Sequence, residues 1–90
     1  MIYKVTYTDV VIVQLRQLHN NDSIRIVKKL GFYASSPNPL TFAKKLTNFD
    51  IAEWRFRVGS FRILFDLLPN GEISIISVVA IERRKDVYRK

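Results

Sequence analysis

The chain contains no cysteine, which excludes disulfide bonds and thiolate metal sites. It has a single histidine, His19, so no histidine cluster can hold a metal ion. No apolar run approaches the roughly 20 residues needed to span a bilayer. The first residues, Met1 to Val5, lack the layout of a signal peptide and have the pattern of a strand instead. We therefore expect a cytoplasmic protein that uses no metal and no other cofactor.

The size of the chain and the balance of its charges narrow the possibilities further. A chain of 90 residues is long enough for one small core, and its 48% hydrophobic content excludes intrinsic disorder, so we expect a single domain over residues 1–90. The formal net charge is +7, which attracts polyanions. Five cations lie within Arg83–Lys90, RRKDVYRK. This segment is either a solvated end or part of a nucleic-acid-binding surface.

In the middle of the chain, arginines alternate with apolar residues on both sides of Gly59-Ser60. Side chains on a strand point alternately to opposite faces, so the pattern predicts a β-hairpin with one apolar and one basic face. If Gly59-Ser60 is a two-residue turn, Val58 lies opposite Phe61 and Arg57 lies opposite Arg62. Like charges opposite one another destabilise a sheet, so a polyanionic partner explains the basic face better than folding does. The apolar face is expected to comprise Trp54, Phe56, Val58, Phe61, Ile63 and Phe65, and the basic face Arg55, Arg57 and Arg62.

Two helices are predicted before the hairpin, following a first strand over Ile2 to Tyr7. Thr8 and Asp9 are suitable caps for the first helix, which is expected to end near His19-Asn20. The second helix is expected to begin after Asn21–Ser23 and to end at the proline-containing segment 35–39. The expected apolar positions are Val11, Ile12, Leu15 and Leu18 in the first helix, and Ile24, Val27, Leu30, Gly31 and Ala34 in the second.

The remaining segments complete an α+β fold. Leu40 to Asp50 mixes apolar and basic residues without a clear period, and we expect a loop or a short helical turn there. Pro69-Asn70-Gly71 has strong turn chemistry. Glu72 to Ile81 is almost wholly apolar, which predicts a central strand buried on both faces. The predicted order is β-α-α-β-β-β, a helical hairpin packed on one face of a small, largely antiparallel sheet.

This arrangement places the candidate site on the face of the sheet that the helices leave open. Arg55, Arg57 and Arg62 project from that face, and the segment after residue 83 is expected to reach the same rim. Asp66 is expected to hold either Arg62 or Arg55 in place. The hairpin aromatics lie on the apolar face, so we interpret them as core residues and not as a base-stacking platform. His19, near a helix end, is expected to be a surface or capping residue.

Two motifs give the chain a family resemblance. The block WRFRVGSFRILF, followed about twenty residues later by RRKDVYR, resembles the RelE/ParE toxins of prokaryotic toxin–antitoxin pairs, as does the order of elements over the whole chain. RelE-like members are ribosome-dependent endoribonucleases that cut mRNA in the decoding site. Their antitoxin neutralises them by wrapping the basic surface. ParE-like members share the fold but inhibit DNA gyrase and need no nuclease site.

The resemblance implies a role for individual residues. The catalytic candidates are Arg55, Arg57, Arg62, Arg84 and Tyr88, and Lys85 is an RNA-binding candidate. The other RNA-binding candidates, chosen for their charge, are Lys44, Lys45, Arg83 and Arg89. The chain departs from the family pattern at two positions. Arg83 stands where many relatives carry a histidine able to move a proton, and Glu82 stands where the best-known RelE type is basic.

Cleavage of RNA by its own 2′-hydroxyl needs a base, an acid and stabilisation of charge on the phosphorane. Arginines supply the stabilisation well, because the guanidinium group is planar and always charged. Tyr88 either takes part in proton transfer, stacks on a nucleobase or packs the end of the chain onto the sheet. Lys44 and Lys45 either contact phosphates or are solvated. Together with this chemistry, the resemblance implies a metal-independent mRNA endoribonuclease with ribosome-bound mRNA and an antitoxin as partners. The alternatives are a gyrase inhibitor of the ParE type and an inactive module that binds RNA or antitoxin.

Overall fold

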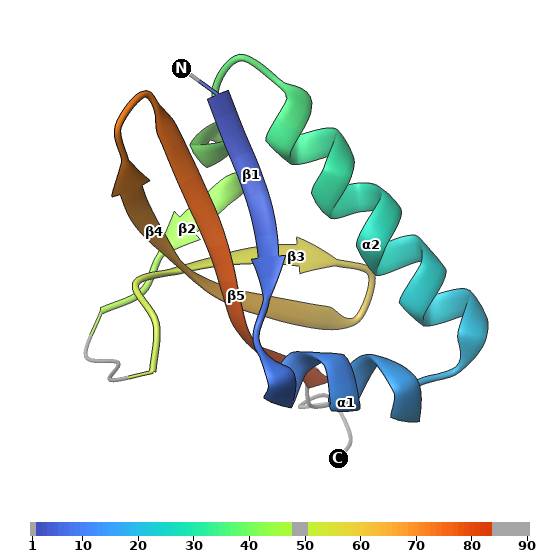
Figure 1. Cartoon of the computed structure of the whole chain (residues 1–90). Helices are drawn as coiled ribbons and strands as arrows, with labels where there is room; N and C mark the ends of the chain where they lie inside the picture. Colours follow the sequence, from blue (N-terminus) through green and yellow to red (C-terminus); the bar gives the residue numbers. More distant parts are fainter. Residues whose placement is uncertain (1, 48–50, 84–90) are drawn as a thin grey trace.

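The structure, a computed structural model, describes residues 2–47 and 51–83. It is an α+β fold in which two helices pack against one face of a five-stranded mixed sheet (Figure 1). Among the described residues, no helix is long and apolar enough to cross a membrane. The elements in chain order are β1 (Ile2–Tyr7), α1 (Asp9–Gln17), α2 (Asn20–Ser35), the 3-10 helix η1 (Pro39–Phe42), β2 (Ala43–Lys45), β3 (Trp54–Val58), β4 (Phe61–Asn70) and β5 (Ile73–Arg83).

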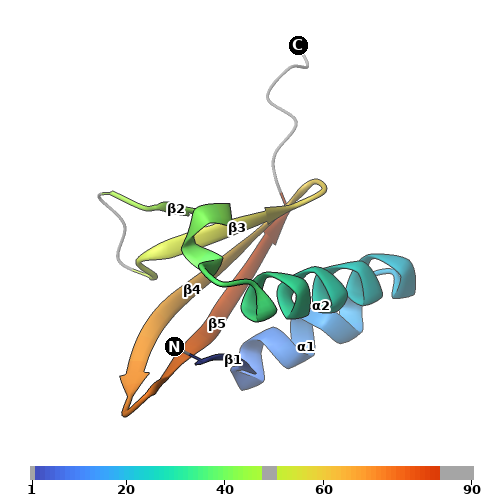
Figure 2. The same ribbon diagram turned by 90° about the horizontal axis from the view of Figure 1, so that it is seen from above.

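The strand order in the sheet is β1-β5-β4-β3-β2. β1 pairs with β5 in parallel, and the other neighbours are antiparallel, as the prediction of a largely antiparallel sheet required. Both helices lie on the same side of the sheet (Figure 2). The core therefore forms between the helices and this side of the sheet, and the other side carries the candidate site.

The hairpin of β3 and β4 has the predicted register. Val58 pairs with Phe61 and Arg57 with Arg62, and Gly59 in the turn adopts a φ of 58°, which a residue with a side chain rarely does. Five of the six predicted core residues on the apolar face are buried. The sixth, Trp54, lies on the same face but is only partly buried against the core.

β5 is central, as predicted, but it is not buried on both faces. The residues that face the helices, such as Ile76 and Val78, are fully buried, whereas Ile73, Ile75 and Val79 are partly exposed. The cause is that both helices cover the same side, so the apolar residues of the other side keep contact with solvent. The register between β4 and β5 shifts at Leu64/Phe65, which places Val79 in a β-bulge.

α1 begins as predicted. The Thr8 hydroxyl accepts a hydrogen bond from the Val11 amide at 3.4 Å, and Val11 is fully buried. The helix ends at Gln17, slightly before the predicted end. The prediction that Ile12 faces the core is wrong, because this side chain is exposed.

α2 faces the core with a different stripe from the predicted one. Ile26, Leu30 and Tyr33 are buried, whereas Ile24 and Val27 are 56% and 43% exposed, so the prediction of their burial is wrong. The buried residues have the i, i+4, i+7 spacing of one helix face. Tyr33 decides the orientation, because its ring stacks on Phe56 with 4.6 Å between the centroids.

The segment after α2 contains an element that the sequence pattern did not reveal. The expected short helical turn is η1, but the next three residues form β2, which pairs with β3 and adds a strand to the predicted order. Three residues are too few to show the two-residue alternation by which strands are found.

The side chain of Gln14 joins α1 to β5 beyond the end of β1. Its amide nitrogen donates to the Ile81 carbonyl and its amide oxygen accepts from the Ile81 amide, both at 2.9 Å. β1 extends only as far as Val78 along β5, so the backbone of Ile81 has no strand partner on that side. Gln14 supplies both hydrogen bonds that a strand would otherwise make.

Candidate functional site

Strand alternation places four cations on the face of the sheet that lies away from the helices. Lys44 pairs with Arg55 across β2 and β3, and Arg57 pairs with Arg62 across β3 and β4. Residues paired across antiparallel strands share a face, with Cβ atoms about 5 Å apart. The two pairs lie in neighbouring rows because Arg55 and Arg57 are two residues apart on one strand. We call Lys44, Arg55, Arg57 and Arg62 the arginine face.

The row nearer the hairpin turn includes a carboxylate. Glu82 pairs with Arg62 across β4 and β5, and its Oε1 accepts a hydrogen bond from Nη2 of Arg62 at 2.5 Å. This ion pair holds the Arg62 guanidinium against Glu82 and offsets the repulsion between the two arginines. Arg57 is exposed, and it has no ion-pair partner among residues 2–47 and 51–83. It is thus the cation of this row that is open to an incoming anion.

The other row has an apolar centre. Leu64 lies opposite Arg55 and is fully buried, although it points away from the helices. Arg55 itself is partly buried. The arginine face is therefore not a uniformly solvated surface. Its charges are arranged around a covered leucine.

Asp66 is not the residue that holds Arg62. Its Oδ1 accepts a hydrogen bond from the backbone amide of Glu53 at 2.9 Å, which ties the segment before β3 to β4. The partner of Arg62 is Glu82, 20 positions further along the chain. The register of β4 against β5 could have revealed this pair, but the bulge at Val79 changes the count between the two strands.

Two of the predicted RNA-binding residues lie on the helix side of the sheet. The Nζ atom of Lys45 lies 5.5 Å from the centroid of the Trp54 ring, and the guanidinium carbon of Arg83 lies 4.7 Å from that of Phe61. Trp54 and Phe61 belong to the apolar face of the hairpin. Lys45 and Arg83 therefore do not join the arginine face, although Arg83 remains near the hairpin turn.

Arg25 also reaches the hairpin turn, from the helix side. Its Nη1 lies where a side chain at Gly59 would place its Cβ, with only 2.5 Å between that position and the nitrogen. Arg25 lies in no sequence motif that marks it as a site residue. The turn is consequently flanked by Arg57 and Arg62 on one face and by Arg25 and Arg83 on the other.

The remaining candidates are Arg84, Lys85, Tyr88 and Arg89, which lie outside the described residues. His19 caps the start of α2 through its carbonyl, which accepts from the Ser23 amide at 3.0 Å, and its side chain is exposed as expected. Burial raises the pKa of Tyr7 and of Tyr33 above the usual range, so neither phenol is a candidate general base near neutral pH. In the part of the chain that is described, no three His, Cys, Asp or Glu side chains gather as metal ligands do.

Comparison with known proteins connects this arrangement to a fold family. No protein-family model matches the chain, and no curated protein sequence does. Solved structures do match. The toxin–antitoxin complex RelBE2 of Mycobacterium tuberculosis aligns with a TM-score of 0.76 at 20% identity, over 93% of this chain and 100% of the matched chain. The archaeal RelE–RelB complex of Pyrococcus horikoshii OT3 aligns with a TM-score of 0.69 at 21% identity, over 97% of this chain and 100% of the other.

The chain has the RelE fold. The similarity covers the described elements from β1 to β5, so the RelE-like architecture expected from the sequence motifs is confirmed. Within this RelE-like fold, the arginine face occupies the side of the sheet away from the helices. At this level of identity the likeness concerns the fold, and activity has to be argued from the site itself.

Proposed function

We propose that this protein is the toxin of a toxin–antitoxin pair and that it cleaves mRNA on the ribosome. The observation that supports the proposal most directly is the arginine face, because four cations gathered on one side of a sheet bring no advantage to folding. The matching solved structures are both toxin–antitoxin complexes, which agrees with the proposal.

In the proposed reaction, the 2′-hydroxyl of a nucleotide attacks the adjacent phosphorus and the 5′-oxygen leaves. Negative charge accumulates on the phosphorane oxygens, and guanidinium groups stabilise it without accepting a proton. Arg57 is placed to contact the phosphate first, since it is exposed and has no carboxylate partner in the described part of the chain. Arg62, oriented by Glu82, provides the second guanidinium of the same row. The proton transfers are proposed to involve Tyr88 or groups of the ribosome.

The proposed partner is an antitoxin that covers the basic surface. The arginine face and the cations around the hairpin turn suit a segment rich in Asp and Glu, since complementary charge guides association. An antitoxin bound there would also occupy the place proposed for the scissile phosphate. Neutralisation and substrate exclusion would then be the same event.

The test is to incubate the purified protein with translating ribosomes and to map the 5′ ends of the message. We expect new ends within codons, and we expect Arg57→Ala with Arg62→Ala to reduce their rate by tenfold or more. Arg16→Ala is the matched control, because it removes the same charge from an exposed position on α1. Intact message together with inhibited supercoiling by purified gyrase would replace this proposal with the ParE-like alternative. Intact message and unaffected gyrase would leave a module that only binds RNA or antitoxin.

A further inference from the structure

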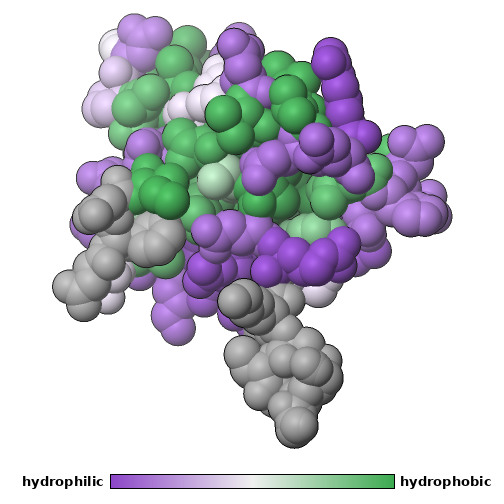
Figure 3. All heavy atoms as spheres, turned by 90° about the horizontal axis from the view of Figure 1, so that it is seen from below, coloured by the Kyte–Doolittle hydropathy of each residue, from purple (hydrophilic) through white to green (hydrophobic). Residues whose placement is uncertain are grey.

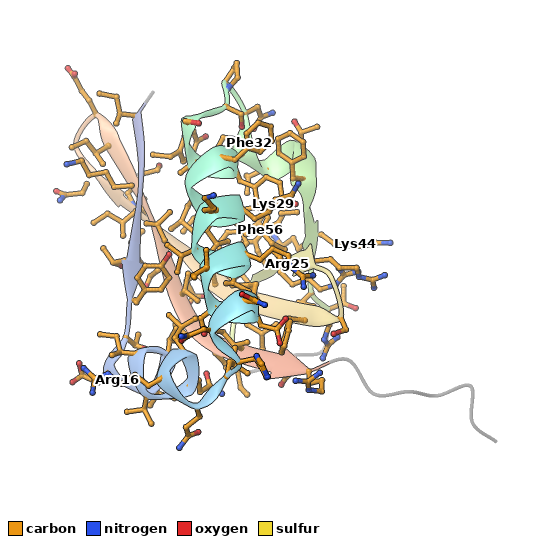
Figure 4. The ribbon with its side chains drawn as sticks, turned by 90° about the vertical axis from the view of Figure 1, so that its right-hand side faces the viewer. Arg16, Arg25, Lys29, Phe32, Lys44 and Phe56 are labelled. Atoms are coloured by element: carbon orange, nitrogen blue, oxygen red, sulfur yellow. The ribbon has the colours of Figure 1, made fainter. Side chains whose placement is uncertain are left out.

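A second group of cations and rings lies on the helix side of the molecule. Arg25, Lys29 and Phe32 follow one another along α2, and Figure 4 shows them on the same flank of the helix. Their i, i+4, i+7 spacing keeps them within about 60° around the helix axis. Phe42 of η1 joins them, with its ring centroid 5.9 Å from that of Phe32. We call these four residues the α2 stripe.

The rings of the α2 stripe are held by a column of aromatic side chains that begins in the core. Phe65, Phe56, Tyr33 and Phe42 stack in sequence, with centroid separations of 4.4, 4.6 and 4.7 Å. Phe65 and Phe56 are fully buried, whereas Phe42 is 43% exposed and Phe32 is 56% exposed. The column fixes the orientation of the Phe42 ring before any ligand binds. Stacking of a base on Phe42 therefore costs little side-chain conformational entropy.

Cations border the exposed rings. The Nζ atom of Lys29 lies 5.6 Å from the centroid of Phe32 and 5.8 Å from that of Tyr33. Arg25 lies at the hairpin-turn end of the stripe, where its Nη2 is 3.2 Å from Oδ1 of Asp22. The Arg25 side chain is 56% exposed and that of Asp22 is 24% exposed, so solvent screens this ion pair. It contributes at most about 1 kcal/mol, and an RNA phosphate can replace it.

The exposed apolar residues of α2 are sorted by type. The aromatic Phe32 shares its flank with Arg25 and Lys29, whereas the exposed aliphatic residues Ile24 and Val27 lie elsewhere around the helix. Further exposed aliphatic residues belong to α1, and Figure 3 shows hydrophobic side chains gathered there between hydrophilic ones. Rings and cations together are the combination that single-stranded nucleic acid uses, because bases stack on rings and phosphates pair with cations.

We propose that the α2 stripe binds single-stranded RNA, with bases stacked on Phe32 and Phe42 and phosphates held by Lys29 and Arg25. This site is separate from the arginine face, which lies on the other side of the sheet. It binds RNA whether or not the protein cleaves message. A failure of the proposed nuclease activity would therefore leave this inference standing, and the reverse also holds.

The test measures the affinity for a labelled oligouridylate of about 12 nucleotides, for RNA duplex of the same length and for polyglutamate. Phe32→Ala should weaken binding of the single strand by about 5- to 100-fold, since one stacked base is lost. Phe32→Leu should weaken it similarly, because leucine keeps apolar bulk without a ring, and Phe32→Trp should restore it. Ile24→Ala is the matched control, as it shortens an equally exposed apolar side chain on the same helix.

Three outcomes would overturn the inference. The first is an affinity of Phe32→Leu for the single strand equal to that of the parent. The second is an equal loss of affinity of Phe32→Ala for polyglutamate, which would identify an acidic polypeptide as the ligand. The third is an equal loss of affinity of Phe32→Ala for duplex RNA. Repeating the series in the Arg57→Ala, Arg62→Ala background should give the same ratios if the two sites are independent. Ultraviolet cross-linking of bromouridine RNA to the unmodified protein provides a second measurement that needs no variant. Cross-links should map to the peptides that contain Phe32 or Phe42, and their absence from both would also contradict the proposal.

Discussion

On the helix side of the β3–β4 hairpin, Phe56, Ile63 and Phe65 are fully buried, whereas on the other side Arg57 is exposed and Arg55 and Arg62 are only partly covered. The two sides differ by a shift of one residue along the same strands. Of two adjacent residues on a strand, one therefore packs in the core and the other carries a surface charge. A substitution on the buried side can therefore lower the stability of the fold without changing its charge. A substitution at the next residue can remove a charge without lowering the stability.

The largest expected effect comes from comparing Phe56→Ala with Arg57→Ala. Phe56 is fully buried and stacks on both Tyr33 and Phe65, so its truncation should cost about 3–5 kcal/mol of unfolding free energy. Arg57→Ala should change stability by less than about 0.5 kcal/mol, as is usual for surface positions. Urea denaturation followed by circular dichroism measures both. Equal destabilisation by the two substitutions would contradict the separation of the faces.

Trp54→Ala sharpens the comparison within the apolar side. Trp54 is only partly buried at the start of β3, and the ammonium of Lys45 lies over its ring. We expect a cost of about 1.5–3 kcal/mol, below that of Phe56→Ala, because less apolar area is removed from water. The same denaturation experiment measures it. A cost above that of Phe56→Ala would mean that the edge of the hairpin matters more to the core than its centre.

Glu82→Gln tests the contribution of an ion pair on the arginine face. The Arg62–Glu82 ion pair joins side chains that are 35% and 36% exposed, so its loss should change stability by no more than about 1 kcal/mol. Affinity for RNA at low salt should rise several-fold, because Arg62 is released from a competing carboxylate. Binding titrations at two salt concentrations measure the change, with Glu72→Gln as the control for general charge. Unchanged affinity and salt dependence in Glu82→Gln would show that Arg62 does not contact the RNA.

The smallest expected effect is at alkaline pH. Burial raises the pKa of Tyr7, so above pH 10 or so the unfolded chain releases this proton while the folded protein retains it. The contribution to stability is complete below that pH and is lost as the pH rises toward the folded pKa. Tyr7→Phe should make the decline in stability above about pH 10 shallower, as measured by thermal unfolding across that range. Lys4→Ala, at an exposed position of the same strand, should leave the tyrosine-dependent decline in place.

The hairpin was predictable because its signals are local. The turn at Gly59-Ser60, the register of Arg57 against Arg62 and the division into two faces all follow from a two-residue period. The orientation of α2 was not predictable in this way. Its exposed Ile24 and Val27 fit an apolar stripe about as well as the buried Ile26 and Tyr33 do, and only the stacking of Tyr33 on Phe56 decides between them. Three-dimensional contact here selects which of two helical stripes is buried.

The candidate site was also predictable only in part. Arg55, Arg57 and Arg62 lie together as their predicted strand positions imply, whereas Lys44 joins them through β2, which the sequence pattern did not reveal. The role of all four in RNA cleavage stays a prediction. The pairing of Arg62 with Glu82 depends on the bulge in β5, which no sequence pattern marks. The two hydrogen bonds between the Gln14 side chain and the Ile81 backbone likewise cannot be predicted without knowing where β1 ends. The roles of Arg84, Lys85, Tyr88 and Arg89 also stay predictions.

The parallel pairing of β1 with β5 has a consequence for the timing of folding. Residues 2–7 leave the ribosome well before their hydrogen-bond partners, residues 73–78, have been made. Closing so long a loop slows folding, and it cannot begin before both strands exist. The β3–β4 hairpin can form earlier, but α1 lacks the β5 backbone that Gln14 binds until Ile81 has been made. The sheet of a nascent chain therefore cannot be completed until β5 has been made, and a product truncated before residue 73 lacks the strand that pairs with β1.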